Sequence, residues 1–141
     1  RQVLKWLNPV PDLACCIYAT AVMLRAEYLR VGHDRLIASG RDFAFSVTGY
    51  DFAPQRALRM MEDGTIEPVQ PEHRMTKSQE LGPRWHDAGQ FYWGRSQAFI
   101  DGVTLYSDRS IGIPIPRLHA VDIDNEEDWE YAQRIYETSR D

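Results

Sequence analysis

The sequence contains only two cysteines in 141 residues, and they are the neighbours Cys15 and Cys16. Adjacent residues of a strand project to opposite faces, so this pair cannot join distant segments of the chain. A disulfide framework is therefore excluded. We expect two small buried side chains and a reducing, cytoplasmic compartment.

Long apolar runs and long basic runs are also missing. No window approaches about eighteen uninterrupted apolar residues, so the pattern predicts neither a transmembrane helix nor another membrane association. The net charge is −5 without a basic cluster, which disfavours a nucleic-acid or anionic-membrane surface. No internal repeat, low-complexity segment or signal-peptide pattern is present. The length and a hydrophobic content of 43% are typical of one globular domain.

Apolar strand patterns alternate with amphipathic helix patterns, which indicates an α/β sheet. The chain opens with the tail of a helix over 1–7. Glycine at 40 favours the end of a helix, and the string at 62–65 predicts a hairpin turn. The segment 54–61 fits a strand or a short helix, and the proline-rich segment 111–116 belongs at a sheet edge or in an extended arm. We expect strands over 13–19 (buried and parallel), 43–48, 91–93 and 121–123, and helices over 26–39, 96–101 and 126–139.

Two acidic residues near the C-terminus are the most informative pattern. In a strand over 121–123, Asp122 and Asp124 share one face, opposite Val121 and Ile123. Carboxylates at the carboxyl end of a strand suit Mg²⁺ together with a bound phosphate. Alternatively, Asp124 caps the following helix with Glu127 as its capping-box partner. Capping would explain Asp124 but gives no reason for Asp122.

A second polar constellation surrounds a glycine before an aromatic strand. Gly89 permits a close approach of a ligand to the backbone. Gln90 and Tyr92 would share a face and could bind a polyol. The alternative is an aromatic core strand with a bulge at Gly89. Histidines 73, 86 and 119 are too widely spaced to indicate a zinc site, and no nucleophile motif is present.

Four segments, in order, resemble the cytidylyltransferases that activate nine-carbon acidic sugars, relatives of the CMP-sialic acid synthetases. The resemblance covers essentially the whole chain, and the string 87–94 is most similar to that of enzymes that act on pseudaminic acid. It implies a Rossmann-like nucleotidyltransferase fold, a three-layer α/β sandwich with a mixed, mostly parallel sheet. It implies one domain over 1–141, with a dimerisation and sugar-binding excursion at about 52–116. The matching segments are 15–20, 54–58, 78–94 and 121–129.

The resemblance also implies the chemistry and the partners. CMP would pass from CTP to the anomeric hydroxyl of the sugar acid with release of pyrophosphate, in a homodimer whose arm at 106–116 reaches the partner's site. The metal would be Mg²⁺, and Lys77 stands where arginine is usual. The implied site residues are Asp122 and Asp124 for the metal and catalysis, Tyr18 and Thr20 for the nucleotide, and Arg56, Lys77, Gln79, Gln90 and Tyr92 for the sugar.

One family feature has no counterpart in this sequence. Nothing in the sequence resembles the Gly-rich basic loop that cradles the CTP phosphates in this family. The nearest glycine-bearing segment, 38–41, follows a helix and not a first strand. The chain also begins with Arg1. We therefore expect the C-terminal two-thirds of such an enzyme, truncated at the N-terminus, with little or no activity alone. Two alternatives stay open: another acceptor (an N-acylneuraminate, a legionaminate-type sugar or a shorter ulosonic acid), and a non-catalytic binding or dimerisation module.

Overall fold

The computed structural model describes residues 1–138 and contains two compact units. The larger unit combines Arg1–Thr48 with the chain from Asp87 onward, and the smaller unit is Gly49–His86. The smaller unit is narrower than the excursion expected at about 52–116, because the chain returns to the larger unit at Asp87. Within the described residues, no helix is both long and apolar enough to cross a membrane.

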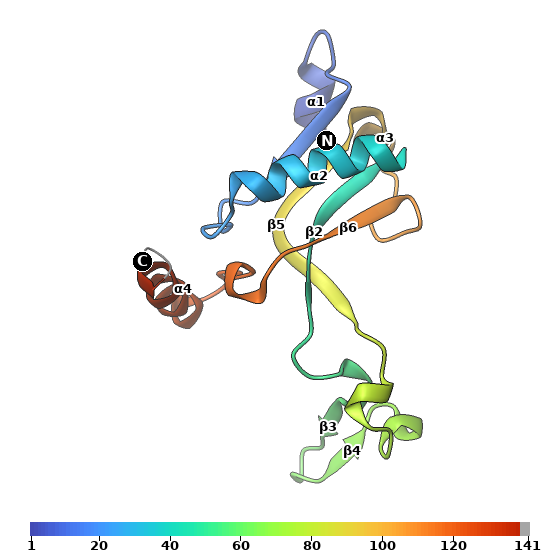
Figure 1. The fold of residues 1–141 in the computed structure, drawn as a ribbon, viewed down its shortest axis with the longest axis vertical. Coiled ribbons are helices and arrows are strands. Elements are labelled where there is room, and N and C mark those ends of the chain that lie inside the picture. The colour runs from blue at the N-terminus through green and yellow to red at the C-terminus, as the bar shows by residue number, and fades with distance from the viewer. Residues whose placement is uncertain (139–141) are drawn as a thin grey trace. The chain divides into compact units, whose positions relative to one another are not determined.

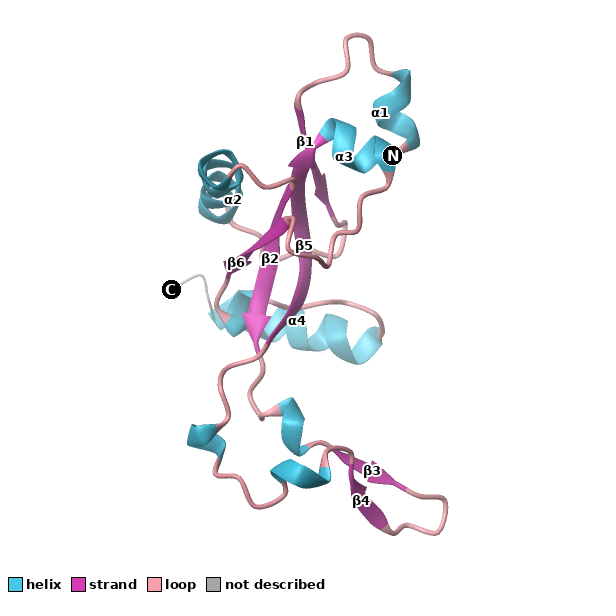
Figure 2. Cartoon of the chain, turned by 90° about the vertical axis from the view of Figure 1, so that its right-hand side faces the viewer, coloured by secondary structure: helices cyan, strands magenta, loops and turns pink. Residues whose placement is uncertain are grey.

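The larger unit is built on a four-stranded sheet (Figures 1 and 2). Strand β1 pairs antiparallel with β5, and β2 pairs in parallel with β6. Between β2 and β5, the amide of Arg95 donates to the carbonyl of Asp42, and the amide of Gln90 donates to Oγ of Ser46. These contacts run in opposite order along the two strands, so this pair is antiparallel. The order is β1 (Leu13–Ile17), β5 (Trp85–Arg95), β2 (Phe43–Gly49) and β6 (Ser110–Pro114).

Three expectations about strands are therefore wrong. The sheet is mixed, but of the pairs among its described strands only β2–β6 is parallel, so it is not mostly parallel. Strand β1 lies at an edge of the sheet, and it is antiparallel and half-exposed. The prediction of a buried parallel strand failed because an apolar run alone does not show which neighbours cover it. The segment 121–123 is an extended loop. Its apolar residues alternate because Val121 is buried against a helix, which requires no strand pairing.

Helix α2 (Ala26–Ser39) has the predicted bounds and packs on one face of the sheet. Its Leu36 joins Ala44, Phe91 and Ile113 in a fully buried cluster. At Gly32, a Cβ atom would lie 2.7 Å from the ring of Phe91, so the glycine permits this close packing. Gly40 ends the helix with a φ of 65°, as predicted.

Three further helices complete the larger unit. Helix α3 (Ser96–Asp101) is confirmed with the predicted bounds, and α1 (Gln2–Trp6) packs against it. Helix α4 (Glu126–Thr138) also begins where predicted, and Ser139, its expected last residue, lies outside the described residues. Ala132 and Ile135 of α4 form a second buried cluster with Met23 and Val121. This cluster anchors the segment that carries the two candidate aspartates.

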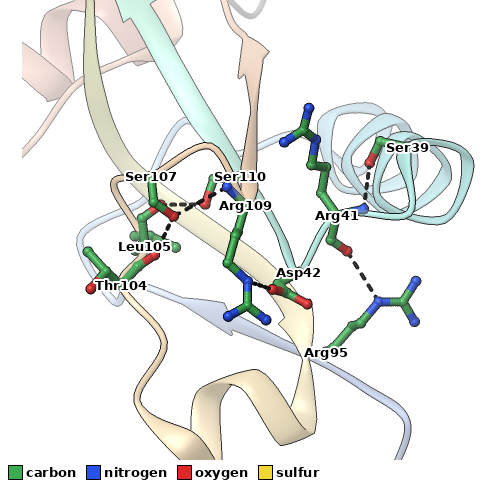
Figure 3. Close-up of polar contacts among 9 residues, drawn as sticks. All are labelled: Ser39, Arg41, Asp42, Arg95, Thr104, Leu105, Ser107, Arg109 and Ser110. Atoms are coloured by element: carbon green, nitrogen blue, oxygen red, sulfur yellow. Dashed lines mark hydrogen bonds and ion pairs between the residues drawn. The ribbon is translucent and has the colours of Figure 1, made fainter.

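Polar contacts at the start of β2 hold the segment that leads into β6 (Figure 3). Arg109 forms an ion pair with Asp42, and Nε of Arg95 donates to the carbonyl of Arg41 at 3.2 Å. Oγ of Ser110 donates to the carbonyl of Leu105. Within the expected arm at 106–116, β6 pairs with the chain's own β2 at the sheet edge that its prolines predict.

The smaller unit contains the predicted hairpin. Strands β3 (Leu58–Met60) and β4 (Ile66–Pro68) pair antiparallel, and Gly64 between them has a φ of 84°. Oδ1 of Asp63 accepts the Thr65 amide at 3.0 Å, which fixes the turn. The segment 54–61 combines both expected forms, a 3₁₀ turn at Pro54–Arg56 followed by β3. Further 3₁₀ turns lie at Pro71–His73 and Ser78–Glu80.

Candidate functional site

His119 anchors the segment that leads to Asp122. It is buried, and its Nδ1 lies 2.5 Å from the hydroxyl of Tyr28 on α2. The side-chain amide of Gln90 donates to the carbonyl of His119. Burial lowers the pKa of His119, so the neutral ring is favoured. With Val121 buried two residues later, the backbone before Asp122 is held from both sides.

The Asp122 carboxylate lies against the backbone of Gly89. A Cβ atom at position 89 would be 3.1 Å from Oδ2 of Asp122 and 3.4 Å from its Cγ. Gly89 has a φ of 63°, a conformation that other residues rarely adopt. Gly89 lies within β5, not before it, and permits a close approach to its backbone. The group that approaches is a carboxylate of this chain and not the expected ligand.

Asp124 is exposed and does not cap α4. Oδ1 of Asn125 accepts the amide of Asp128 at 3.1 Å, and Oδ2 of Asp128 accepts the amide of Asn125 at 3.1 Å. This reciprocal pair is a capping box displaced by one residue from the expected pair of Asp124 and Glu127. The alternative explanation for Asp124 is therefore wrong, since the cap uses its neighbour.

The two aspartates are suited to a magnesium ion. Both are exposed, whereas Val121 and Ile123 are wholly or partly buried, as the predicted alternation requires. Among residues 1–138, neither carboxylate has a hydrogen bond or ion pair within the protein. In the same range, no group of three His, Cys, Asp or Glu residues could hold a metal. Mg²⁺ commonly takes one or two carboxylates together with water and substrate phosphate, and this pair fits that pattern.

Tyr18 and Tyr92, predicted for opposite sides of the reaction, lie together. Their ring centroids are 5.1 Å apart, and Tyr92 also stacks on Phe45. Tyr106 also contacts Phe45, edge to face, with a centroid distance of 5.8 Å. The three tyrosines line a cavity of about 260 Å³ with a mainly apolar wall, completed by Cys16, Phe43, Phe99, Val103 and Leu105.

Asp87 holds two of these tyrosine hydroxyls. Its Oδ2 accepts from the hydroxyl of Tyr92 at 2.7 Å and from that of Tyr106 at 2.6 Å. The bond to Asp87, with burial, raises the pKa of Tyr106 to about 12. Burial, followed by the bond to Asp87, raises the pKa of Tyr92. Both hydroxyls therefore remain protonated at neutral pH and donate to the carboxylate.

Gln90 does not accompany Tyr92 in the cavity. It is fully buried, and its amide group faces the carbonyl of His119. The expectation that Gln90 binds a polyol beside Tyr92 therefore conflicts with its burial. Its backbone carbonyl accepts the amide of Tyr18 at 3.0 Å, which aligns the end of β1. Thr20 is half-buried and follows in the same loop.

The remaining sugar-site candidates belong to the smaller unit. Arg56 is exposed, and its Nη1 donates to Oγ of Ser78 at 3.1 Å. Lys77 and Gln79 flank Ser78 and are also exposed. Arg56 is thus joined to the 77–79 segment, 22 residues away in the sequence, and these side chains form one polar group within that unit.

The sequence pattern does not single out Asp87, Tyr106 or His119. Except for the local bonds of Asp87, the contacts of these three residues join positions that are 19 to 91 residues from each other in the sequence. The available signal for Asp87 is its place two residues before a glycine, since aspartate commonly accepts the amide two residues on. For His119, the wide spacing from other histidines argues against a zinc ligand but does not predict its burial.

Comparison with known proteins shows what the chain is similar to. No protein-family model matches the chain. The pseudaminic acid cytidylyltransferase of Campylobacter jejuni serotype O:2 is 30% identical over 140 residues, which are 99% of this chain. The enzyme of the same name from serotype O:23/36 matches to the same extent.

The chain is a homologue of pseudaminic acid cytidylyltransferases. It spans about 60% of the length of the two Campylobacter proteins. A Helicobacter pylori protein that is both a pseudaminic acid cytidylyltransferase and a UDP-2,4-diacetamido-2,4,6-trideoxy-beta-L-altropyranose hydrolase is 30% identical over 113 residues. That match covers 79% of this chain and 22% of the relative. The family resemblance read from the sequence is confirmed, and it applies to part of a longer relative.

Proposed function

We propose that this chain is part of a cytidylyltransferase that moves CMP from CTP to pseudaminic acid, a nine-carbon sugar acid. The whole-chain similarity to two pseudaminic acid cytidylyltransferases carries this proposal. Because those relatives are longer, the activity is proposed for a protein that also supplies their remaining part, with a Rossmann-like fold. We expect little turnover from the 141 residues alone.

Asp122 and Asp124 are the proposed magnesium ligands. Their support is exposure, the freedom of both carboxylates among the described residues, and the anchored backbone before them. A bound Mg²⁺ would neutralise charge on the CTP phosphates and on the departing pyrophosphate. The chain's contribution is to present two exposed carboxylates that have no competing hydrogen bonds within residues 1–138.

Transfer itself needs a defined alignment. The anomeric hydroxyl of the sugar attacks the α-phosphorus of CTP, the bond from that phosphorus to the bridging oxygen breaks, and the hydroxyl proton passes to solvent. Tyr18 and Thr20 are proposed for the nucleotide side, and Tyr92 for the sugar side. The contact between Tyr18 and Tyr92 supports placing these two sides together.

The charged group in the smaller unit is proposed to bind the sugar carboxylate. Arg56 offers the fork that grips a carboxylate with two hydrogen bonds. Lys77 adds a second positive charge, though without that fork geometry, and Gln79 adds an amide. We also propose that the protein acts as a homodimer, as the family resemblance implies.

Pyrophosphate release tests the proposal directly. The assay uses the complete open reading frame that encodes the chain, with CTP, Mg²⁺ and pseudaminic, neuraminic, legionaminic and shorter ulosonic acids. Release with pseudaminic acid alone would support the proposed substrate. Release with another acid would show that this acid, and not pseudaminic acid, is the substrate. No release from a folded protein would favour a non-catalytic module.

The metal assignment has its own test. Asp122→Asn should lower Mg²⁺-dependent turnover by about a hundredfold, since removing one charged stabilising group typically costs 10²–10³. Asp34→Asn is the matched control, because Asp34 is exposed on α2 and outside the site. Equal turnover in wild type and Asp122→Asn would overturn the assignment of Asp122.

A further inference from the structure

Asp87 accepts hydrogen bonds from three residues, two on its own strand β5 and one in the loop before β6. Its Oδ1 accepts the amide of Gly89 at 2.8 Å, two residues ahead. Its Oδ2 accepts the hydroxyls of Tyr92 on β5 and of Tyr106 in the loop before β6. Asp87 is half-buried, so these bonds are partly shielded from water and stronger than exposed ones.

The first of these bonds fixes the turn against which Asp122 lies. Gly89 adopts a φ of 63°, and the amide bond to Asp87 favours this local conformation over an extended one. The Asp122 carboxylate then lies beside Gly89, with its Oδ2 3.1 Å from the position that a Cβ atom at residue 89 would take. A change in the turn would therefore move the wall that limits the Asp122 side chain.

The other two bonds connect the same carboxylate to the cavity. Tyr92 is buried and stacked on Phe45, whereas Tyr106 is 67% exposed. Together they hold Asp87 in one orientation, because both hydroxyls point to the same oxygen. The Asp87 carboxylate is thus hydrogen-bonded both to tyrosines that line the cavity and to the amide of Gly89.

We propose that Asp87 is a positioning residue for Asp122, acting through the Gly89 turn and held in place by Tyr92 and Tyr106. Asp87 itself would not bind the cation. The part of this inference that concerns cation affinity rests on the proposed metal role of Asp122. The part that concerns the position of Asp122 does not depend on it.

Amide NMR of the 141-residue chain tests the positional part without any metal. In Asp87→Ala, the signals of Asp122 and Ile123 should shift together with those of Ala88 and Gly89. Asp63→Asn is the matched control, because Asp63 also accepts an amide two residues ahead, in the β3–β4 turn. Unchanged Asp122 and Ile123 signals in folded Asp87→Ala would overturn the proposal.

Mn²⁺ binding, followed by electron paramagnetic resonance of the free ion, tests the consequence. Asp87→Ala should weaken Mn²⁺ affinity about tenfold, as is typical when a group that orients a metal ligand is removed. Asp87→Asn should recover most of it, because its side-chain oxygen can still accept the Gly89 amide. If Asn is as weak as Ala although its Gly89 amide signal matches that of wild type, the turn does not set the affinity and positioning is overturned.

Two outcomes separate this inference from the proposed function. If wild type and Asp122→Asn both fail to bind Mn²⁺, the metal role of Asp122 fails, and the amide signals still decide the positional part. If Asp87→Ala does not fold, Gly89→Ala replaces it, since its methyl group would enter the space beside Oδ2 of Asp122. Unshifted Asp122 signals in folded Gly89→Ala would overturn the inference.

Discussion

The hydroxyl of Tyr28 lies 2.5 Å from Nδ1 of His119, which ties α2 to the segment that carries Asp122. Because burial lowers the pKa of His119 below its ordinary value of 6.5, the folded chain binds this proton less readily than the unfolded chain. The burial of His119 therefore makes stability depend on pH.

We expect the free energy of unfolding to fall as the pH is lowered through 6.5 toward the folded-state pKa. In that window the unfolded chain binds more protons, with a slope of at most about 1.4 kcal/mol per pH unit. His119→Gln should reduce this slope in urea unfolding measured between pH 5 and 8. His33→Gln, at a half-exposed position of α2, should keep it, and an unchanged slope in His119→Gln would contradict the prediction.

The cap of α4 gives a second prediction. Asn125→Ala or Asp128→Ala should lower the free energy of unfolding by about 1 kcal/mol, because each removes a side chain that satisfies backbone amides at the helix start. Asp124→Ala should change it by less than about 0.5 kcal/mol. Urea midpoints followed by circular dichroism give the comparison. An equal loss in Asp124→Ala and Asn125→Ala would show that Asp124 is part of the cap.

Local signals in the sequence predicted the helices well. The end of α2 was predicted from Gly40, which adopts a positive φ just after the helix, and the structure shows the same conformation at Gly102 after α3. The hairpin around Gly64 follows from its turn residues. Sheet order and direction depend instead on pairing between distant segments. An apolar run such as Leu13–Ile17 has the same sequence pattern in an edge strand as in a central strand of a parallel sheet.

In the candidate site, too, local features were predictable from the sequence and contacts between distant segments were not. The alternation that places Asp122 and Asp124 opposite Val121 and Ile123 is visible in four consecutive residues, and the burial pattern agrees with it. Gln90 was predictable only as a residue of a strand, because its burial depends on His119, 29 residues away. The role of Asp87 depends on Tyr106, which comes from a separate loop.

The adjacent cysteines should differ sharply in reactivity. Burial raises the pKa of Cys15 to about 11, whereas Cys16 is exposed on the other face of β1, contrary to the expectation that both are buried. At pH 8 only roughly one Cys15 thiol in a thousand would be ionised, and the thiolate is the reactive form. Iodoacetamide should modify Cys16 at least about tenfold faster, as measured by peptide mass spectrometry.

Single cysteine variants control for this difference. Cys16→Ser should leave only slow modification, and Cys15→Ser should retain the fast reaction. Comparable rates in the two variants would show that β1 opens readily or that Cys15 is not shielded.

Packing at the end of β5 should make Gly94 intolerant of a side chain. A Cβ there would lie 2.5 Å from Cε2 of Phe99 and 2.6 Å from Cδ1 of Phe43. These rings contact each other edge to face with centroids 5.0 Å apart, so neither can move freely. Gly94→Ala should lower the free energy of unfolding by about 1–3 kcal/mol, the usual cost of overpacking. Gly82→Ala is the control, because its nearest neighbour, the end of the flexible Arg84 side chain, is 3.6 Å away.

A double-mutant cycle identifies the cause of that loss. Phe99→Leu removes part of the ring that the new methyl group would meet, so the cost of Gly94→Ala should fall in this background. Denaturant unfolding of the four proteins gives the coupling free energy. An equal cost of Gly94→Ala with and without Phe99→Leu would show that Phe99 does not set the limit. Since Phe99 belongs to α3 and Gly94 to β5, a measured coupling would also establish that α3 is seated on the sheet by this contact.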